Sequence, residues 1–344
     1  MLKILIRPST ELYIGRNLLT TDRLLEFCGK LRTILIADVA IKDLYAVDLA
    51  RKIHAELLTI PTGEKAKSRE TEQNLIDELF KMGCGRDTLL IALGGGVTTD
   101  LVGFVASVYM RGVPLILIPT TLLAIVDAAI GGKTAIDTPY GKNLIGTIYS
   151  PKAIFADLDT LRTLPEKEWL NGFAEILKMG LIYDSSIWQK KGVKNDELIL
   201  KAVQGKIAIV EQDPTELGFR RILNFGHTIG HAIEAISQYE MPHGEAVALG
   251  CVLEAHLSMH LGYLSERDFE QILGSFSSFP LRLPKNCTRQ NLFNAMVYDK
   301  KNASGKVRFV LIDRIGHAIS FEGQYCRPVS EKELKATFEW MKNN

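Results

Sequence analysis

Short apolar runs alternate with amphipathic segments over the first half of the chain. The runs are rich in Leu, Ile and Val, and they predict strands at Leu2–Ile6, Thr33–Ala37, Glu56–Ile60, Thr88–Leu93 and Leu115–Pro119. The segments between them place apolar residues at helical spacing, and they predict helices at Leu18–Lys30, Ile41–Ile53, Arg69–Met82 and Leu101–Tyr109. Apolar strands that alternate with helices are typical of a parallel sheet covered on both faces. An α/β domain is therefore expected over residues 1–157.

The pattern changes after about Asp157 and becomes mainly helical from Leu161 to Gln271. Asn195 and Ser265 are candidate N-caps, and the candidate helix stops are Gly180, Gly192, Gly205 and Gly262. Two short strands, Arg308–Ile312 and Ala318–Phe321, and a last helix, Glu331–Lys342, follow. Residues 158–344 should therefore form a second, mainly helical domain.

Composition narrows the classes of protein to consider. Apolar residues make up 47% of the 344 residues and charged residues 24%, which is ordinary for globular proteins. The formal net charge is only +1, so no overall field favours nucleic acid or an anionic membrane as a partner. No apolar run approaches the roughly 20 residues of a membrane-spanning helix. The cysteines are scattered and form no Cys-x-x-Cys pair, which argues against disulfides and a cysteine zinc site. A cytoplasmic protein is expected.

Three consecutive glycines follow the strand predicted at Thr88–Leu93. Gly94, Gly95 and Gly96 lead directly into a helix. Glycine permits positive φ and a close approach of the backbone to a ligand, and a helix start offers free N–H groups to a pyrophosphate. The spacing matches neither the G-x-G-x-x-G fingerprint nor a P-loop, so a tight turn without a ligand is the alternative.

Polar residues follow two other predicted strands. Thr120 and Thr121 come after the strand that ends at Pro119, and Gly63-Glu64-Lys65-Ala66-Lys67 comes after the strand that ends near Ile60. Because parallel strands end on one edge of the sheet, these turns should lie with the glycines where open α/β sheets bind ligands. Together they favour a dinucleotide site.

Histidines and one glutamate are candidate metal ligands. His227 and His231 are four residues apart and would share one face of a helix, and His243 opens another helix. Glu175 and Lys178 would share a face of a third helix. Imidazoles with one carboxylate suit zinc or a similar ion that keeps a position open for substrate. The spacing does not choose among the histidines, because His-x-x-x-His occurs on many helices.

A second pair, His256 and His260, has the same helical spacing. No turn glycine and no nearby cluster of acid and cation accompany it. A partly exposed structural pair is therefore predicted.

Several cations lie close to these motifs, although a single lysine or arginine is usually a solvated surface charge. They are Lys133, Lys142, Lys178, Lys206, Arg220, Arg221, Lys300 and Lys301. A phosphate-bearing substrate would need several such groups together. With a net charge near zero, convergence on a small anion is more plausible than a nucleic-acid surface.

The ordered set of motifs resembles the 3-dehydroquinate synthase family from about Asp38 to Val310. The motifs are Gly94–Val97, Tyr109–Gly112, Pro119–Leu123, Asp127, Gly131–Thr134, Gly141–Asn143, Glu175–Lys178, Leu223–Ala232, His243–Val247 and Asp299–Lys301. Each piece alone is unspecific, and the combination is highly specific. The resemblance implies a Rossmann-like NAD-binding domain followed by a helical domain that binds metal and substrate.

The resemblance also implies an activity. The reaction would be the second step of the shikimate pathway, from 3-deoxy-D-arabino-heptulosonate 7-phosphate to 3-dehydroquinate and phosphate. NAD would oxidise the C5 hydroxyl, phosphate would be eliminated, the ketone would be reduced again, and an aldol step would close the ring. Such an enzyme is a carbon–oxygen lyase, and the family expectation is a homodimer.

Residue roles follow from the resemblance by position. One divalent metal ion, zinc or cobalt, would bind Glu175, His227 and His243, so that His231 belongs to the substrate site. The phosphate would bind Lys133, Asn143, His231 and, from the neighbouring subunit, Arg111. The carboxylate and hydroxyls would contact Asp127, Lys178, Lys206, Arg220, Asn224 and one of Lys300 and Lys301. NAD would contact Asp38, Glu64, Lys67, Gly95, Gly96, Asp100, Thr120, Thr121, Lys142, Thr163 and Leu164.

The sequence departs from the family pattern at two places. Thr99 stands where the family usually has a glycine, and Asp137 ends a segment that usually reads Gly-Val-Asn. Neither change removes a proposed catalytic group, but both bear on the local backbone. Glu245 has no assigned role.

Three alternatives stay open at this point. A related sugar-phosphate cyclase, making 2-deoxy-scyllo-inosose or a valiolone, would share the chemistry, and contacts of Lys206 and Arg220 to a substrate carboxylate would distinguish it. A metal-dependent polyol dehydrogenase would need no phosphate cluster and would release NADH. A silent ligand-binding protein would have no reason to keep the Glu175, His227 and His243 set.

Overall fold

The computed structural model describes residues 1–6, 10–189, 194–298 and 306–343. The chain forms two compact units, Met1–Trp169 and Leu170–Asn344. The change of pattern near Asp157 thus precedes the division between the units. In the part of the chain that the structure describes, no helix combines the length and apolar character needed to cross a bilayer.

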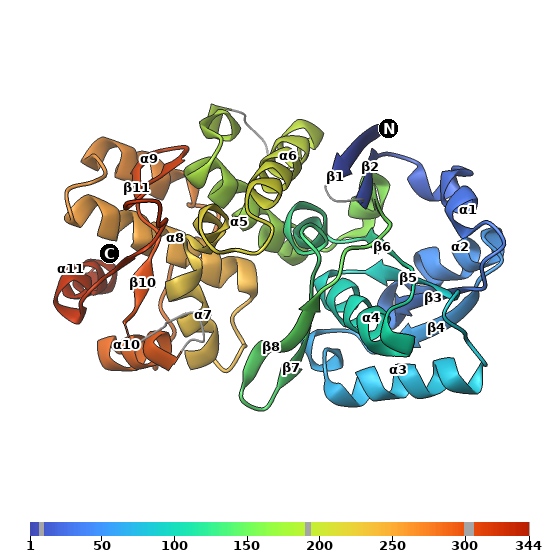
Figure 1. The fold of residues 1–344 in the computed structure, drawn as a ribbon. Helices are drawn as coiled ribbons and strands as arrows, with labels where there is room; N and C mark the ends of the chain where they lie inside the picture. Colours follow the sequence, from blue (N-terminus) through green and yellow to red (C-terminus); the bar gives the residue numbers. More distant parts are fainter. Residues whose placement is uncertain (7–9, 190–193, 299–305, 344) are drawn as a thin grey trace. The chain divides into compact units, whose positions relative to one another are not determined.

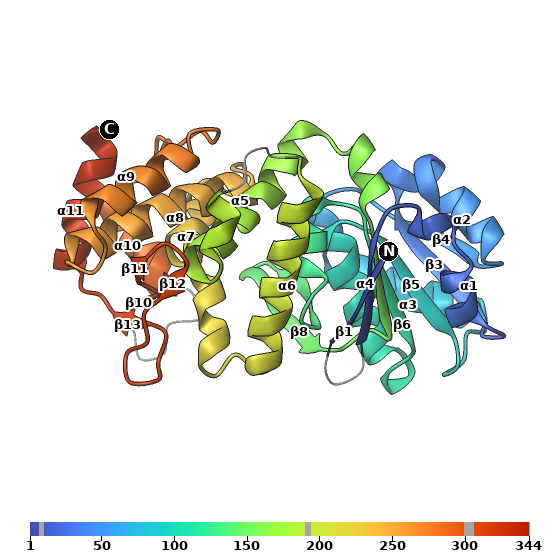
Figure 2. The same ribbon diagram turned by 90° about the horizontal axis from the view of Figure 1, so that it is seen from above.

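The first unit contains a seven-stranded sheet in the order β1-β2-β9-β6-β5-β3-β4 (Figures 1 and 2). The strands are β1 Leu2–Ile6, β2 Thr10–Gly15, β3 Thr33–Asp38, β4 Glu56–Ile60, β5 Leu89–Gly94, β6 Leu115–Pro119 and β9 Ala153–Asp157. All neighbours pair in parallel except β1, which runs antiparallel to β2. The expected parallel sheet is confirmed, with β2 and β9 as additional strands.

Helices cover both faces of this sheet. On one face, α1 (Arg23–Cys28) and α2 (Val47–Lys52) enclose a core with alternate residues of β3, β5, β6 and β9. On the other face, α4 (Gly96–Val108) packs on β5 and β6, with α3 (Arg69–Lys81) beside it. The strands β3, β5, β6 and β9 are buried at nearly every position, as a sheet covered on both faces requires.

Two helices predicted in this unit are broken into short pieces. The segment Leu18–Lys30 forms the 3₁₀ turn η1 (Leu18–Thr20) and then α1. The Thr20 and Thr21 hydroxyls donate to carbonyls three residues earlier, which competes with a continuing helix. The segment Ile41–Ile53 forms η2 (Val39–Ile41), the π-helical η3 (Lys42–Ala46) and α2.

A hairpin, β7 (Lys133–Thr138) with β8 (Gly141–Ile148), was not predicted as strands. It packs beside α4 and lies apart from the main sheet (Figure 1). Its sequence is rich in glycine and polar residues and lacks a continuous apolar run. Yet it carries three of the candidate residues, Lys133, Lys142 and Asn143.

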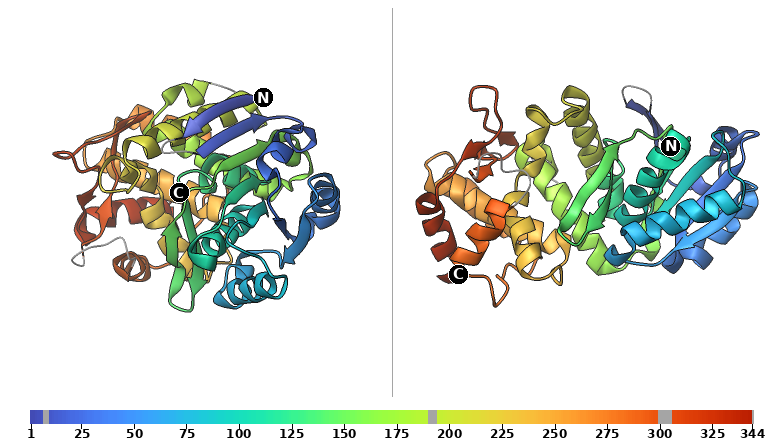
Figure 3. Two further views of the ribbon diagram at one scale, coloured as in Figure 1. Left: turned by 45° about the vertical axis from the view of Figure 1, so that its right-hand side comes forward. Right: turned by 60° about the horizontal axis from the view of Figure 1, so that its bottom comes forward.

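The second unit is mainly helical, as expected (Figure 3). Its helices are α5 Glu166–Ile182 (beginning in the first unit), α6 Asp196–Gln212, α7 His227–Ile236, α8 His243–His260, α9 Glu266–Ser275, α10 Arg289–Tyr298 and α11 Glu331–Asn343. The 3₁₀ turns η8 (Ser185–Gln189) and η9 (Phe219–Asn224) precede α6 and α7. Short two-stranded pairs join β10 (Arg308–Phe309) to β13 (Arg327–Pro328) and β11 (Ile312–Arg314) to β12 (His317–Ala318).

The predicted helix ends are only partly confirmed. Asn195 caps α6 and Ser265 caps α9 through side-chain hydrogen bonds, and Gly262, with φ +79°, follows α8. Gly180 and Gly205 were wrong as stops, because they lie inside α5 and α6. A Cβ at Gly180 would overlap the Trp188 ring, so this glycine makes room for a neighbour. Gly192 lies outside the described residues.

His256 and His260 lie in α8, and only His256 is buried. The His256 ring stacks on Trp340 at 4.7 Å between centroids, and its Nδ1 lies 3.1 Å from Thr337 Oγ1. Burial, aided by His260, lowers the pKa of His256 to about 4. The structural role predicted for this pair fits these contacts, although His256 is more deeply enclosed than expected.

Acid should therefore weaken the fold through His256. Between the folded pKa of about 4 and the ordinary value of 6.5, the unfolded chain binds more protons than the folded one. The free energy of unfolding should fall by about 2 kcal/mol through this residue from pH 7.5 to pH 5. Urea unfolding of the wild type and of His256→Leu at both pH values measures it. An equal pH dependence in the two proteins would contradict the assignment.

Candidate active site

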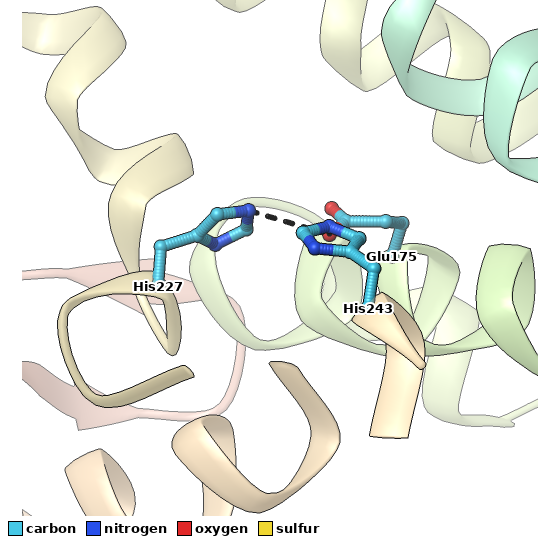
Figure 4. Close-up of side chains that lie close together, drawn as sticks. All are labelled: Glu175, His227 and His243. Atoms are coloured by element: carbon cyan, nitrogen blue, oxygen red, sulfur yellow. Dashed lines mark ion pairs between the residues drawn. The ribbon is translucent and has the colours of Figure 1, made fainter. Parts of the chain in front are cut away.

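Three side chains of the second unit converge on one point. Glu175 comes from α5, His227 from the first turn of α7 and His243 from the first turn of α8. Their ligand atoms all lie within 4.8 Å of one another, and Figure 4 shows the side chains pointing toward each other. The Nε2 atoms of His227 and His243 lie 3.5 and 3.6 Å from the same Glu175 oxygen. Tetrahedral ligands about 2.1 Å from a zinc ion would be separated by about 3.4 Å, so these residues fit such an ion.

The remaining nitrogen of each imidazole faces an acceptor. His227 Nδ1 lies 3.2 Å from the Phe225 carbonyl oxygen, and His243 Nδ1 lies 3.4 Å from Glu234 Oε2. A metal-binding histidine usually donates its other N–H to such a group, which fixes the tautomer and the ring orientation. Both rings therefore present Nε2 to the same point as Glu175.

A close contact between α7 and α8 sets the separation of the two histidines. A Cβ on Gly250 of α8 would overlap the Gly226 carbonyl oxygen and stand 3.0 Å from the Gly230 nitrogen. A Cβ on Gly230 would in turn lie 3.1 Å from the Ala246 carbonyl oxygen. The two helices thus meet main chain to main chain, which requires glycine at these positions.

His231 lies beside this cluster and belongs to a second group of potential ligands, with Glu234 and His243. Its ring centroid is 5.1 Å from that of His227 and 6.2 Å from that of His243. The two groups share His243, but the Nδ1 that faces Glu234 is not the nitrogen that faces Glu175. The helical spacing of His227 and His231 therefore does not by itself identify the ligand pair.

The charges around the cluster favour a cation. Although burial disfavours the imidazolium, the carboxylates of Glu175 and Glu234 raise the pKa of His243 to about 10. Glu175 is also paired with Lys178, and both side chains are buried. The cluster thus combines a buried carboxylate, two imidazoles and a buried ammonium group in one place.

Three candidate cations of the second unit are buried. Lys178, Lys206 and Arg220 are 1%, 6% and 1% exposed, against the usual expectation that such residues are solvated. Arg220 donates to the Pro214 carbonyl oxygen at 2.8 Å, and Asn224 donates to Glu216 at 2.8 Å. Burial of cations is costly unless anions compensate it, and for Lys178 the Glu175 carboxylate is such a partner.

In the first unit, the candidate NAD residues other than Lys142 of β8 lie at the carboxyl ends of parallel strands. They end β3 (Asp38) or follow β4 (Glu64, Lys67), β5 (Gly95, Gly96, Asp100), β6 (Thr120, Thr121) and β9 (Thr163, Leu164). In the strand order, β4 and β5 lie on opposite sides of β3, so the direction of winding reverses between β3 and β5. Open α/β sheets bind ligands at such a switch point.

The glycine turn is formed differently from expectation. None of Gly94, Gly95 and Gly96 has a φ in the left-handed region. Instead, a Cβ on Gly94 would overlap the Thr98 hydroxyl, and a Cβ on Gly95 would stand 3.0 Å from Thr121 Cγ2. Close approach of neighbouring side chains, and not positive φ, therefore favours glycine at Gly94 and Gly95, whereas a Cβ on Gly96 would make only an ordinary contact with Ala128.

One lysine joins the glycine turn to the hairpin. Lys67, 4% exposed, lies 2.5 Å from Asp100 of α4 and donates to the Asn143 side chain of β8. Burial lowers the pKa of Lys67, but the Asp100 carboxylate outweighs this effect and the pKa is raised. Lys142 lies 3.7 Å from Glu64, which adds a second ion pair between hairpin and sheet edge.

Both departures from the family pattern are accommodated. The Thr99 hydroxyl donates to the Gly96 carbonyl oxygen at 3.0 Å within α4. Asp137 accepts the backbone N–H of Asn143 at 2.9 Å, which supports Asn143 at φ +56°. Burial and the Glu64 carboxylate raise the pKa of Asp137 to about 6.

The other candidates lie in separate places. Asp127 belongs to the π-helical η6 (Ala124–Ala128), and Lys133 is exposed at the start of β7. Arg111 is exposed after α4, with the left-handed φ of +67°. Lys300 and Lys301 lie outside the described residues.

Residue-by-residue reasoning did not find Glu234, Glu254 or Asn171, which contact the histidines or the helices that carry them. Glu234 stands three residues after His231, so helical spacing could have indicated it. Glu254 and Asn171 act across helices, and no local spacing points to them.

Comparisons with known proteins agree with this architecture. The family model for the 3-dehydroquinate synthase N-terminal domain matches residues 57–171, and the model for the C-terminal domain matches residues 172–302. A 3-dehydroquinate synthase of Thermodesulfovibrio yellowstonii is 41% identical, over 95% of this chain and 96% of the relative. One of Pseudoalteromonas atlantica is 40% identical, over 90% of this chain and 93% of the relative.

Solved structures show the same fold. A 2-epi-5-epi-valiolone synthase of Streptomyces hygroscopicus subsp. jinggangensis, with NAD⁺ and Zn²⁺ bound, superposes with a TM-score of 0.86. It is 28% identical, and the match covers 100% of this chain and 99% of the other. A 2-deoxy-scyllo-inosose synthase gives a TM-score of 0.89 at 24% identity, over 98% and 99% of the chains, which speaks for the fold alone. With the family models and the curated relatives, the chain belongs to the 3-dehydroquinate synthase family.

Proposed function

We propose that this chain is a 3-dehydroquinate synthase, a phosphate-eliminating lyase that converts 3-deoxy-D-arabino-heptulosonate 7-phosphate to 3-dehydroquinate. Oxidation at C5 acidifies the neighbouring C6–H, so that phosphate can leave, and reduction and an aldol closure complete the reaction. Three curated relatives at 40–42% identity over most of the chain carry this name.

The proposed metal ligands are Glu175, His227 and His243, which fit one zinc or cobalt ion by spacing and donor type. A bound ion would act as a Lewis acid on the substrate oxygens at C4 and C5. Glu234 and the Phe225 carbonyl orient the two imidazoles. His231, beside the same cluster, is proposed to contact the substrate phosphate and to handle protons.

The observation that carries the proposal is the burial of three cations in the same unit as this cluster. Lys178, Lys206 and Arg220 offer charge-assisted hydrogen bonds that suit a carboxylate and its neighbouring hydroxyls. A polyol dehydrogenase acts on a neutral substrate and would need no cluster of residues that binds phosphate. The three buried cations also favour a carboxylate substrate over those of the related cyclases. Asn224 and Asp127, with a lysine of the 300–301 pair, are proposed to hold hydroxyls.

NAD is proposed to bind at the switch point of the first unit. Asp38 at the end of β3 suits the ribose hydroxyls, and the start of α4 at Gly95 and Gly96 suits the pyrophosphate. Further proposed contacts are Glu64, Lys67, Asp100, Thr120, Thr121, Lys142, Thr163 and Leu164. Lys133 and Asn143 of the hairpin are proposed to contact the phosphate of the substrate.

The chain is further proposed to act as a homodimer in which Arg111 of one subunit reaches the phosphate of the other. Large apolar side chains are exposed at the end of α4 (Val108) and on β8 (Leu144 and Ile148). The Ser107 and Thr147 hydroxyls, 2.8 Å apart, place the end of α4 beside β8. A cytoplasmic location stays a prediction from the cysteine pattern.

Phosphate release tests the proposal. Protein, Zn²⁺ or Co²⁺, a trace of NAD and the heptulosonate phosphate should release phosphate in large excess over NAD, because NAD is reoxidised in each turnover. A chelator should stop the reaction, and added metal should restore it. NADH that accumulates one-for-one with substrate consumed would instead favour the dehydrogenase alternative. Turnover of a sugar phosphate that lacks the carboxylate would favour a related sugar-phosphate cyclase.

A further inference from the structure

Glu254 is a fully buried acid on α8 that belongs to neither group of potential metal ligands. Its Oε2 accepts the backbone N–H of Gly226 at 2.8 Å, and its Oε1 accepts that of Ile229 at 3.2 Å. Both groups lie at the N-terminus of α7, where backbone N–H groups have no partner within their own helix. A carboxylate from another helix therefore caps the helix that begins with His227.

The turn at Gly226, which Glu254 caps, lies next to His227 and to the carbonyl group that its ring faces. Gly226 adopts the left-handed φ of +78°, and a Cβ there would overlap Cys251 Sγ and stand 3.0 Å from the Cys251 nitrogen. The ring nitrogen Nδ1 of His227 faces the Phe225 carbonyl, one peptide before this turn. A shift of the Gly226 peptide would therefore move both the His227 backbone and the acceptor that orients its ring.

An equivalent contact holds the other histidine. Asn171 of α5 accepts the backbone N–H of Gly244 at 3.0 Å, next to His243 at the start of α8. A Cβ on Gly244 would overlap the Asn171 backbone, so the two chains meet closely here. Thus α5 caps α8, α8 caps α7, and α7 supplies Glu234 to His243.

A buried charge is more than helix capping alone requires. Neutral serine, threonine or asparagine side chains are effective N-caps, whereas removing a carboxylate from water is costly. Glu254 also lies close to the cluster: burial raises the pKa of the Cys251 thiol well above its usual range, and Lys178, Glu254 and Glu175 all act on that pKa as well. The carboxyl group of Glu254 thus differs from an ordinary neutral N-cap both in its chemistry and in its closeness to the proposed metal ligands.

We propose that Glu254 is a positioning residue that holds His227 in its metal-binding orientation, with Asn171 as its counterpart for His243. The inference rests on the metal site of the proposed function. It assigns to Glu254 no contact with metal or substrate.

The test is Glu254→Gln, which keeps the size of the side chain but removes the charge and one acceptor. The affinity of the purified apoprotein for Zn²⁺ should fall at least about tenfold, measured by competition with a chromophoric chelator. The visible absorption bands of the Co²⁺ form should shift, because they report ligand geometry. NAD affinity, measured by titration, should stay at the wild-type value.

Ser258→Ala is the matched control. Ser258 is as buried as Glu254, lies one turn further along α8, and bonds to the Glu254 carbonyl and the Ile312 N–H without reaching α7. Its loss should lower the urea midpoint and leave metal affinity and the Co²⁺ bands unchanged. If both variants change metal affinity equally at equal loss of stability, Glu254 has only a structural role and the proposal is wrong.

Asn171→Ala keeps the test decisive if Glu254→Gln does not fold. Metal affinity should fall in this variant as well, and wild-type affinity would overturn the proposal. Failure of the wild-type apoprotein to bind Zn²⁺ at all is a different result, because it would overturn the metal site of the proposed function itself.

Discussion

Replacing His227 with alanine is expected to lower kcat by roughly a thousandfold, since the loss of a metal ligand removes several kcal/mol of Lewis-acid stabilisation. The space left by the missing imidazole lies in the second unit and should not disturb the first unit, which contains the proposed NAD residues. Zinc content after dialysis should fall in parallel with phosphate release. Titration with NAD should give a dissociation constant close to that of the wild type.

His260→Ala provides the control for a lost imidazole. His260 is exposed at the end of α8, away from the three converging ligands. This variant should retain both zinc and turnover. A His227→Ala protein that keeps its zinc and loses only NAD binding would show that the cofactor and metal sites have been assigned to the wrong units.

Gly250→Ala is expected to be the most destabilising single-methyl change in the second unit. The added carbon would overlap the Gly226 carbonyl oxygen and stand 2.9 Å from its carbon, and main chain cannot rotate away as a side chain can. Forcing α7 and α8 apart should lower the free energy of unfolding by roughly 3 kcal/mol. Metal affinity should fall too, because the two helices carry His227 and His243. Urea unfolding of the apoprotein and zinc titration measure the two effects.

Gly274→Ala separates the clash from the general effect of a helix glycine. Gly274 is exposed in α9, and a Cβ there would meet nothing within 4 Å. Alanine favours the helix over glycine, so this variant should be more stable by about 0.5 kcal/mol. Equal stability changes in the two variants would show that the α7–α8 contact is looser than its geometry indicates.

Five of the seven strands of the sheet could be located from their apolar runs, whereas the buried β2 and β9 were missed. The runs at β3, β5 and β6 are continuous and apolar, and they were located to within a residue. The β7–β8 hairpin was missed because it lies outside the sheet and carries polar and glycine residues. Gly180 and Gly205 were misjudged because their neighbours, Trp188 and Met179, are close in space and unknown to any local pattern.

In the candidate site too, residues with a local sequence pattern could be found, whereas contacts between distant segments could not. The residue types at Glu175, His227 and His243 indicated a metal site, but helical spacing favoured His231 equally, and only the resemblance to a family chose among them. The contacts of Glu254 and Asn171 join segments 25 to 73 residues apart. Such contacts depend on how helices pack, which no spacing along the chain encodes.

The main-chain contact between α7 and α8 also bears on which ions the site would accept. Because Gly226, Gly230 and Gly250 leave no side chain between the helices, no rotamer change at this contact can alter how closely the helices that carry His227 and His243 approach. The metal-binding side chains should therefore fit ions within a narrow range of radius. Ions with bonds near 2.1 Å and a preference for imidazole suit it. Calcium, which needs six to eight oxygen ligands at about 2.3–2.6 Å, should be excluded by size and coordination number even at high concentration.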